Sequence, residues 1–189
     1  QWWAELLAAD PPRGAILVTN DRDEMMPLWY AQQVEGIRAD LVGVFPGLLS
    51  GEEWAHVGAV LDQALATGRP AALIKPMPGI EVKVRLGAPD AVGLTPVDGP
   101  AVVRAPQQPE NVAIGADLRL VGYDAAPRDL APGETVQVDL QWQPLRRTPV
   151  NLTSFVHLQT LDGVRVAQSD HLLGGVFYPT SLWEPGETL

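Results

Sequence analysis

The sequence predicts an α/β domain over residues 1–104 and an all-β domain over residues 112–189. The first is expected to be half of a doubly wound parallel sheet, because continuous apolar runs alternate with helical patterns there. The second is expected to be an incomplete immunoglobulin-like β-sandwich, because its apolar and polar residues alternate with a period of two. The polar, proline-rich segment 105–111 between them is expected to be a linker.

Composition supports packed domains and excludes several classes of protein. A hydrophobic fraction of 46% in 189 residues is too high for a disordered chain, and 18 prolines with 18 glycines favour short strands over a helical bundle. The net charge of −10 argues against nucleic acid as a partner. The absence of cysteine excludes disulfides and thiolate chemistry.

Three apolar runs are expected to form the parallel strands of the first domain. They cover residues 15–19, 40–45 and 71–75, and each is continuous, which is typical of a strand covered on both faces. Residues 2–10 fit a short helix that precedes the first strand. Because helical patterns separate the strands, the connections are expected to be right-handed crossovers of a parallel sheet.

Two longer helices are expected between these strands. The first covers residues 24–36, where Pro27 is tolerated in the first turn. The second is expected to begin at a capping box formed by Ser50 and Glu53 and to end at Gly68.

After the third strand the pattern becomes antiparallel. Residues 81–86 alternate between apolar and polar side chains, and residues 92–104 fit two strands joined by a turn at Asp98-Gly99. These strands are expected to add an antiparallel edge to the parallel sheet.

A hairpin is the clearest element of the second domain. Residues 152–159 and 164–171 flank Asp162-Gly163, a favoured turn sequence. One face of the hairpin is expected to carry Val156, Leu158 and Ala167. The other is expected to carry Phe155, His157, Gln159, Val166, Gln168 and Asp170.

The two ends of the sequence carry unusual features. Trp2 and Trp3 follow Gln1, and such a pair either fills the core face of the first helix or lies at a membrane interface. The tetrapeptide Pro-Gly-Glu-Thr occurs at 132–135, before an alternating strand, and again at 185–188. The second copy is expected to precede a strand too, which predicts a fragment of a longer protein with a bare sheet edge.

Both halves of the sequence resemble one family. Segment 15–44, AILVTNDRDEMMPLWYAQQVEGIRADLVGV, resembles the soluble region after the membrane helices of bacterial protein-O-mannosyltransferase-like glycosyltransferases of the GT-C superfamily. The later part of the sequence resembles the β-sandwich that often ends such proteins. The similar segments are LRLVGYD (118–124), PGETVQVDLQWQPL (132–145), FVHLQTLDGVRVAQSDH (155–171) and YPTSLWEPGET (178–188).

The resemblance implies an accessory role for this chain. In that family the catalytic acid lies in a loop of the transmembrane part, and the donor is a polyprenyl-phosphate sugar held by the membrane region, so no catalytic residue carries over. The resemblance implies a region on the extracytoplasmic side of a bacterial membrane, tethered by transmembrane helices outside this sequence. Its partners would be the rest of the parent chain and a glycan or acceptor protein. A structural spacer is the alternative without a ligand.

The turn after the first strand is a candidate ligand site. Asn20, Asp21 and Asp23 follow the strand at 15–19, and ligands of doubly wound sheets bind beyond the carboxyl ends of strands. Asp21 and Asp23 could hold a divalent cation such as Mn²⁺ or Mg²⁺, which would in turn bind a sugar nucleotide in a transferase. The alternative is that Asn20 or Asp21 caps the following helix and no cofactor is bound.

The polar face of the predicted hairpin is a second candidate site. Amide and carboxylate groups beside an aromatic ring suit sugar hydroxyls and the apolar face of a sugar. The residues concerned are Phe155, His157, Gln159, Gln168 and Asp170. The alternative is an ordinary solvated sheet face.

Overall fold

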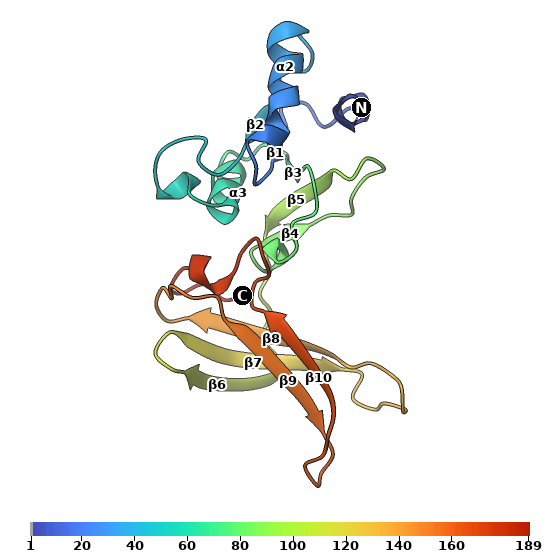
Figure 1. Ribbon diagram of the computed structural model, residues 1–189, viewed down its shortest axis with the longest axis vertical. Coiled ribbons are helices and arrows are strands. Elements are labelled where there is room, and N and C mark those ends of the chain that lie inside the picture. The colour runs from blue at the N-terminus through green and yellow to red at the C-terminus, as the bar shows by residue number, and fades with distance from the viewer. Residues whose placement is uncertain (1) are drawn as a thin grey trace. The chain divides into compact units, whose positions relative to one another are not determined.

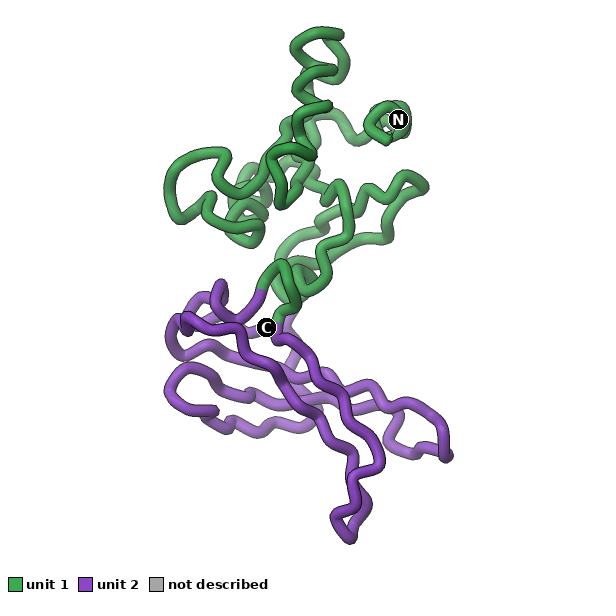
Figure 2. Tube along the Cα trace, viewed as in Figure 1, with its two compact units in different colours: residues 1–100, 174–178 green, residues 101–173, 179–189 purple. Residues whose placement is uncertain are grey.

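The computed structural model describes residues 2–189, which form two compact units with a mixed α/β architecture (Figures 1 and 2). Of the described residues, unit 1 comprises 2–100 and the segment 174–178, and unit 2 comprises 101–173 and 179–189. Unit 1 contains a mixed five-stranded sheet, whereas unit 2 contains a three-stranded and a two-stranded antiparallel sheet. The predicted combination of an α/β part with a β part is confirmed at this level.

Unit 1 combines a parallel core with an antiparallel edge. Its strands are β1 (Ile16–Val18), β2 (Val42–Val44), β3 (Ala71–Leu73), β4 (Val84–Leu86) and β5 (Thr95–Pro100). Its helices are α1 (Trp2–Ala8), η1 (Asp23–Met25), α2 (Met26–Val34), η2 (Glu52–Trp54), α3 (Val57–Ala66) and η3 (Ile80–Val82). The sheet order is β2-β1-β3-β5-β4, with β1 parallel to β2 and β3, and β5 antiparallel to β3 and β4. The predicted antiparallel edge is thereby confirmed.

Strand β1 is buried on both faces, as its continuous apolar run predicts. Leu17 is fully buried in a cluster that includes Leu6 of α1 and Leu28 of α2. Gly43 of β2 lets η1 and α2 approach this face, because a Cβ there would lie 2.7 Å from Met25 Sδ of η1 and 3.2 Å from Leu28 Cδ2 of α2. Side chains alternate along a strand, so Ile16 and Val18 point to the opposite face, and α3 contacts β1.

The predicted capping box is wrong. Residues 52–54 form η2 with Gly51 at its N-cap, and no side chain caps it. Helix α3 begins at Val57, and its N-cap residue is His56, whose Nδ1 accepts a hydrogen bond from Ala59 N at 3.2 Å. The Ser-x-x-Glu pattern failed because a separate 3₁₀ turn precedes the helix.

The predicted turn at Asp98-Gly99 is also wrong. Both residues lie inside β5, where the register with β4 shifts between Arg85 and Leu86. Gly99 has a φ of 130°, a conformation that favours glycine in bulges as well as in turns. The sequence signal was therefore correct about the backbone conformation and wrong about a reversal of the chain.

Unit 2 is built from antiparallel strands. They are β6 (Gln108–Ile114), β7 (Leu118–Ala126), β8 (Gln137–Pro144), β9 (Thr153–Gln159) and β10 (Arg165–Leu172), followed by the short η4 (Thr180–Leu182). The sheets are β6-β7-β8 and β9-β10. The predicted hairpin is confirmed: His157 pairs with Gln168, and Phe155 pairs with Asp170.

Strand β6 begins within the segment predicted as a linker. Gln108 pairs with Tyr123 and Pro109 pairs with Gly122, so the ladder starts before residue 112. Pro109 is tolerated because β6 is an edge strand and its register shifts directly after this residue. The second half of the segment 105–111 is therefore part of an irregular edge strand, and the two units divide between residues 100 and 101.

Candidate functional site

The strand order of unit 1 creates a topological switch point beside β1. The chain passes from β1 to β2 on one side and then to β3 on the other side of β1 (Figure 1). Ligands of open α/β sheets bind beyond the carboxyl ends of the strands at such a point. Here the relevant segments are residues 19–24, after β1, and residues 74–76, after β3.

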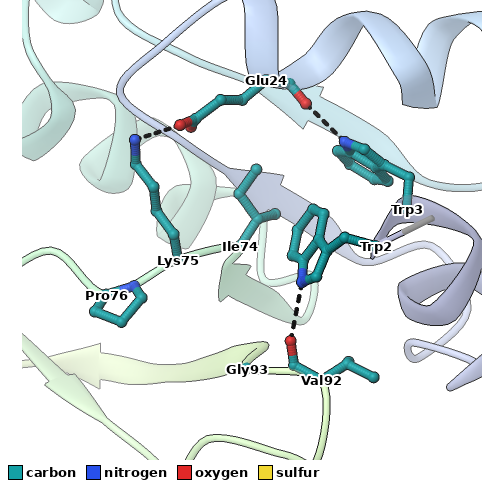
Figure 3. A pocket seen from close by; sticks show the side chains of 8 residues that line it. All are labelled: Trp2, Trp3, Glu24, Ile74, Lys75, Pro76, Val92 and Gly93. Carbon is teal, nitrogen blue, oxygen red and sulfur yellow. Dashed lines mark hydrogen bonds and ion pairs between the residues drawn. The ribbon is translucent and has the colours of Figure 1, made fainter.

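A pocket of about 330 Å³ lies at this position (Figure 3). This volume is at the lower end of the roughly 300–1,000 Å³ range of small-ligand sites. Segments far apart in the sequence supply its walls: α1, the turn after β1, the end of β3 and the loop before β5. The lining residues are Trp2, Trp3, Glu24, Ile74, Lys75, Pro76, Val92 and Gly93.

Two indole rings form the aromatic wall of the pocket. Trp2 Nε1 donates to Val92 O at 3.2 Å, and Trp3 Nε1 donates to Glu24 O at 2.9 Å. The ring centroids are 5.2 Å apart and the planes meet at 77°, a favourable edge-to-face geometry. Trp2 is 36% exposed although its polar atom is bonded, so an apolar indole surface is available to a ligand.

A fixed ion pair forms the polar side of the pocket. Lys75 Nζ pairs with Glu24 Oε1, and the buried hydroxyl of Thr19 donates to Glu24 Oε2. The Lys75 and Glu24 side chains are each about one-third exposed (33% and 32%). An ammonium group has three donors and a carboxylate has several lone pairs, so both groups retain capacity for a ligand.

The acidic turn residues predicted as a metal site lie outside the pocket lining. Asn20, Asp21 and Asp23 are exposed. Asp21 Oδ1 accepts a hydrogen bond from Asp23 N at 2.9 Å, and Asp23 pairs with Arg22 at 3.6 Å. Across residues 2–189 there is no group of three or more His, Cys, Asp or Glu that could hold a metal ion. Asp21 thus stabilises the entry to η1 through a local turn, close to the capping role that the sequence offers as the alternative.

The polar hairpin residues share one exposed surface, and one of them, Gln168, also lines a groove of about 600 Å³. The pairs His157–Gln168 and Phe155–Asp170 direct their side chains to one face of the β9-β10 sheet, and Gln159 lies at the end of the same ladder. All five side chains are exposed, and Phe155 is 66% exposed. They therefore form an exposed patch on this face of the hairpin.

Sequence reasoning missed Glu24 and Lys75. The switch-point argument was applied to the end of the first strand alone, although it concerns the ends of two neighbouring strands. Lys75 is the last residue of the predicted strand 71–75, and a charged residue there was the available signal. Trp2 and Trp3 were expected on the core face of the first helix or at a membrane interface. Trp3 does pack against the buried core of unit 1, and both residues also line the pocket.

Comparisons with other proteins give no match: not with protein-family models, not with curated proteins and not with solved structures. Among residues 2–189, no helix combines the length and the apolar character needed to cross a membrane.

Proposed function

We propose that this chain is a non-catalytic carbohydrate-binding region of a membrane-bound, glycosyltransferase-like protein. It would act on the extracytoplasmic side of a bacterial membrane, tethered by helices outside residues 1–189. Its partners would be the rest of the parent chain and a glycan or glycosylated acceptor. The resemblance of segment 15–44 supports this assignment, and that segment supplies Thr19 and Glu24.

We also propose a fold type for each unit. Unit 1 has the strand order and buried parallel strands expected for half of a doubly wound domain. Unit 2 has two antiparallel sheets with inward apolar residues, as an immunoglobulin-like sandwich that lacks strands would have.

The observation that carries the proposal is the combination of indole rings with a fixed ion pair in one small pocket. A sugar ring presents apolar C–H groups on its faces and hydroxyl groups around its edge. Trp2 offers an apolar surface, while Glu24 and Lys75 offer an acceptor and a donor within the same lining. The volume of about 330 Å³ suits one sugar residue with its nearest substituent.

The chemistry of the lining favours binding over catalysis. Covalent catalysis needs a nucleophile with an adjacent base, and the eight lining residues supply no such pair. Both oxygens of Glu24 are already engaged, by Thr19 and by Lys75. The carboxylate is therefore positioned for recognition of a ligand.

Calorimetric titration of the whole chain with a panel of neutral hexoses, N-acetylhexosamines and short oligosaccharides tests this proposal. We expect at least one sugar to bind and to change tryptophan fluorescence. Trp2→Ala and Lys75→Met should each weaken that binding roughly tenfold or more, because a hydrogen bond to a charged group contributes about 1.5–3 kcal/mol.

Tyr30→Ala is the matched control, since Tyr30 is an exposed aromatic residue of the same unit that does not line the pocket. The proposal fails if no sugar binds, or if Tyr30→Ala weakens binding as much as Trp2→Ala does. Binding of a sugar nucleotide that requires Mn²⁺ and Asp23 would instead support a metal-dependent transferase.

A further inference from the structure

A tyrosine of segment 174–178, the later of the two segments of unit 1, packs against the first turn of α3. Tyr178 is fully buried, and a Cβ at Gly58, the second residue of α3, would overlap its ring. Lys83 Nζ donates to Tyr178 Oη at 3.3 Å and lies 5.0 Å from the centre of the Tyr178 ring. The first turn of α3 and the side chain of Lys83 thus form the seat of Tyr178.

His56 caps the same turn through its imidazole ring. As the N-cap residue of α3, it accepts a hydrogen bond at Nδ1 from Ala59 N at 3.2 Å. A ring nitrogen accepts only while it carries no proton, so this contact requires a neutral His56 with its proton on Nε2. The centroids of the His56 and Tyr178 rings are 6.0 Å apart. A change in the charge of His56 therefore acts directly on the seat of Tyr178.

The charged groups around this turn act on His56 in opposite directions. The ammonium group of Lys83 and the positive end of the α3 dipole both disfavour an imidazolium ion here. The carboxylates of the surrounding elements favour it instead, and they are Glu52 and Glu53 on η2, Asp62 on α3 and Glu81 on η3. Neither set removes the conflict at Nδ1, because a proton on that atom excludes the hydrogen bond from Ala59 N.

We propose that His56 is an acid-sensitive latch for segment 174–178. Histidine takes up its second proton at about pH 6.5. Once Nδ1 of His56 is protonated, the first turn of α3 loses its cap and gains a positive charge at the positive end of the helix dipole. This turn carries Gly58, so Tyr178 loses one wall of its seat.

The direction of the effect follows from proton binding. The docked state, in which His56 Nδ1 accepts from Ala59 N, binds fewer protons than a released state in which the imidazole is unconstrained. Docking therefore weakens as the pH falls below about 6.5. Mild acid should increase the population of molecules in which Tyr178 has left its seat, while the parallel strands of unit 1 stay folded.

Amide hydrogen exchange of the whole chain at about pH 7.5 and about pH 5.5, corrected for the intrinsic pH dependence of exchange, tests the latch. We expect the amides of Ala59 and Tyr178 to exchange at least about fivefold faster at the lower pH, as loss of one N-cap would allow. The nitrogen-15 chemical shift of His56 Nδ1 should report an unprotonated acceptor at the higher pH and a protonated nitrogen at the lower pH.

Three variants separate the latch from a general effect of acid. His56→Asn supplies a good N-cap that does not titrate, so both amides should exchange slowly at both pH values. His56→Ala lacks the cap, so both amides should exchange rapidly at both pH values. His157→Asn is the matched control, because His157 is exposed on β9 of unit 2, and this variant should keep the full pH response.

Two results would overturn the proposal outright. The first is equal corrected exchange of the wild type at the two pH values, and the second is a full acid response in His56→Asn. Faster exchange at Ala59 without any change at Tyr178 would also overturn it, because the cap would then titrate without controlling segment 174–178.

Discussion

The two units differ in how completely they bury their apolar residues. All three residues of β1 are at most 3% exposed, and the central strands of unit 1 are covered by helices or neighbouring segments. In unit 2 every residue of β10 is exposed. Among the described residues, the buried apolar side chains of unit 2 are Leu118, Pro144, Leu173, Pro179 and Trp183. Unit 1 is therefore a closed fold, whereas unit 2 has an open interior.

The two units also differ in how completely their buried polar atoms are hydrogen-bonded. Two buried side-chain atoms lack a hydrogen-bond partner among residues 2–189, Gln141 Oε1 and Trp142 Nε1, and both belong to β8. Buried polar atoms are normally satisfied, so an unpaired atom marks a place where the surroundings are incomplete. The two units therefore differ in polar satisfaction as well as in apolar burial: both unpaired atoms belong to unit 2.

Truncation of one leucine in each unit tests this difference in apolar burial, and it has the largest expected effect. Leu17→Ala in β1 removes a fully buried side chain and should destabilise unit 1 by about 2–5 kcal/mol. Leu158→Ala in β9 should change stability by about 0.5 kcal/mol or less, because the side chain is already partly solvated. Urea unfolding followed by amide exchange in each unit measures both. Similar losses for the two variants would show that unit 2 is as closed as unit 1.

A glycine in α3 tests whether the segment 174–178 belongs to the closed core. A Cβ at Gly58 would lie 2.4 Å from Tyr178 Cε2, and Tyr178 is fully buried. Gly58→Ala should therefore cost about 1–3 kcal/mol from overpacking, offset in part by about 0.5–1 kcal/mol of helix propensity. In a Tyr178→Ala background the same substitution should become neutral or stabilising in thermal unfolding. An unchanged cost in that background would place the strain elsewhere.

Local patterns predicted the fold well and long-range contacts poorly. The buried strands around Leu17 and Ala72 and the hairpin around Gly163 follow from periodicity and turn residues that lie close together in the sequence. The ion pair between Glu24 and Lys75 joins residues 51 positions apart, and no local pattern specifies such a pair. The site therefore depended on knowing the strand order, which the sequence alone left open.

Some local signals were ambiguous for a physical reason. A positive φ at glycine serves a turn, a bulge or a helix end equally well, so Gly99 could not distinguish a hairpin from a bulged strand. His56 caps α3 through Nδ1, a role that the usual Ser, Thr, Asp and Asn preference does not anticipate.

The ion pair between Arg38 and Asp40 should make unit 1 sensitive to acid. Hydrogen bonds from Arg38 and from Gly14 N hold the pKa of Asp40 well below its ordinary range. A carboxyl whose pKa is lower in the folded state stabilises that state above its unfolded pKa of about 3.9 and loses this contribution as the pH falls. Unit 1 should therefore lose stability below about pH 4, and Asp40→Asn should flatten that dependence in pH-resolved thermal unfolding.

Asp162 provides the matched control for the acid effect. A hydrogen bond from Thr160 lowers the pKa of Asp162 in the hairpin turn of unit 2. Asp162→Asn should thus change the acid response of the hairpin and leave that of unit 1 intact. If Asp162→Asn flattens the response of unit 1 as Asp40→Asn does, the acid transition is a property of the whole chain.

The smallest expected effect concerns Asp21, which distinguishes a structural turn from a cation site. An asparagine oxygen can still accept the hydrogen bond from Asp23 N, so Asp21→Asn should change the stability of unit 1 by no more than about 0.5 kcal/mol. Asp21→Ala removes the acceptor and should cost about 0.5–2 kcal/mol, as loss of a capping group does. Mn²⁺ should leave the unfolding temperature of wild type and Asp21→Asn equal. A Mn²⁺-dependent stabilisation of wild type that Asp21→Asn abolishes would show that the charge of this carboxylate, beyond its hydrogen bond, holds a cation.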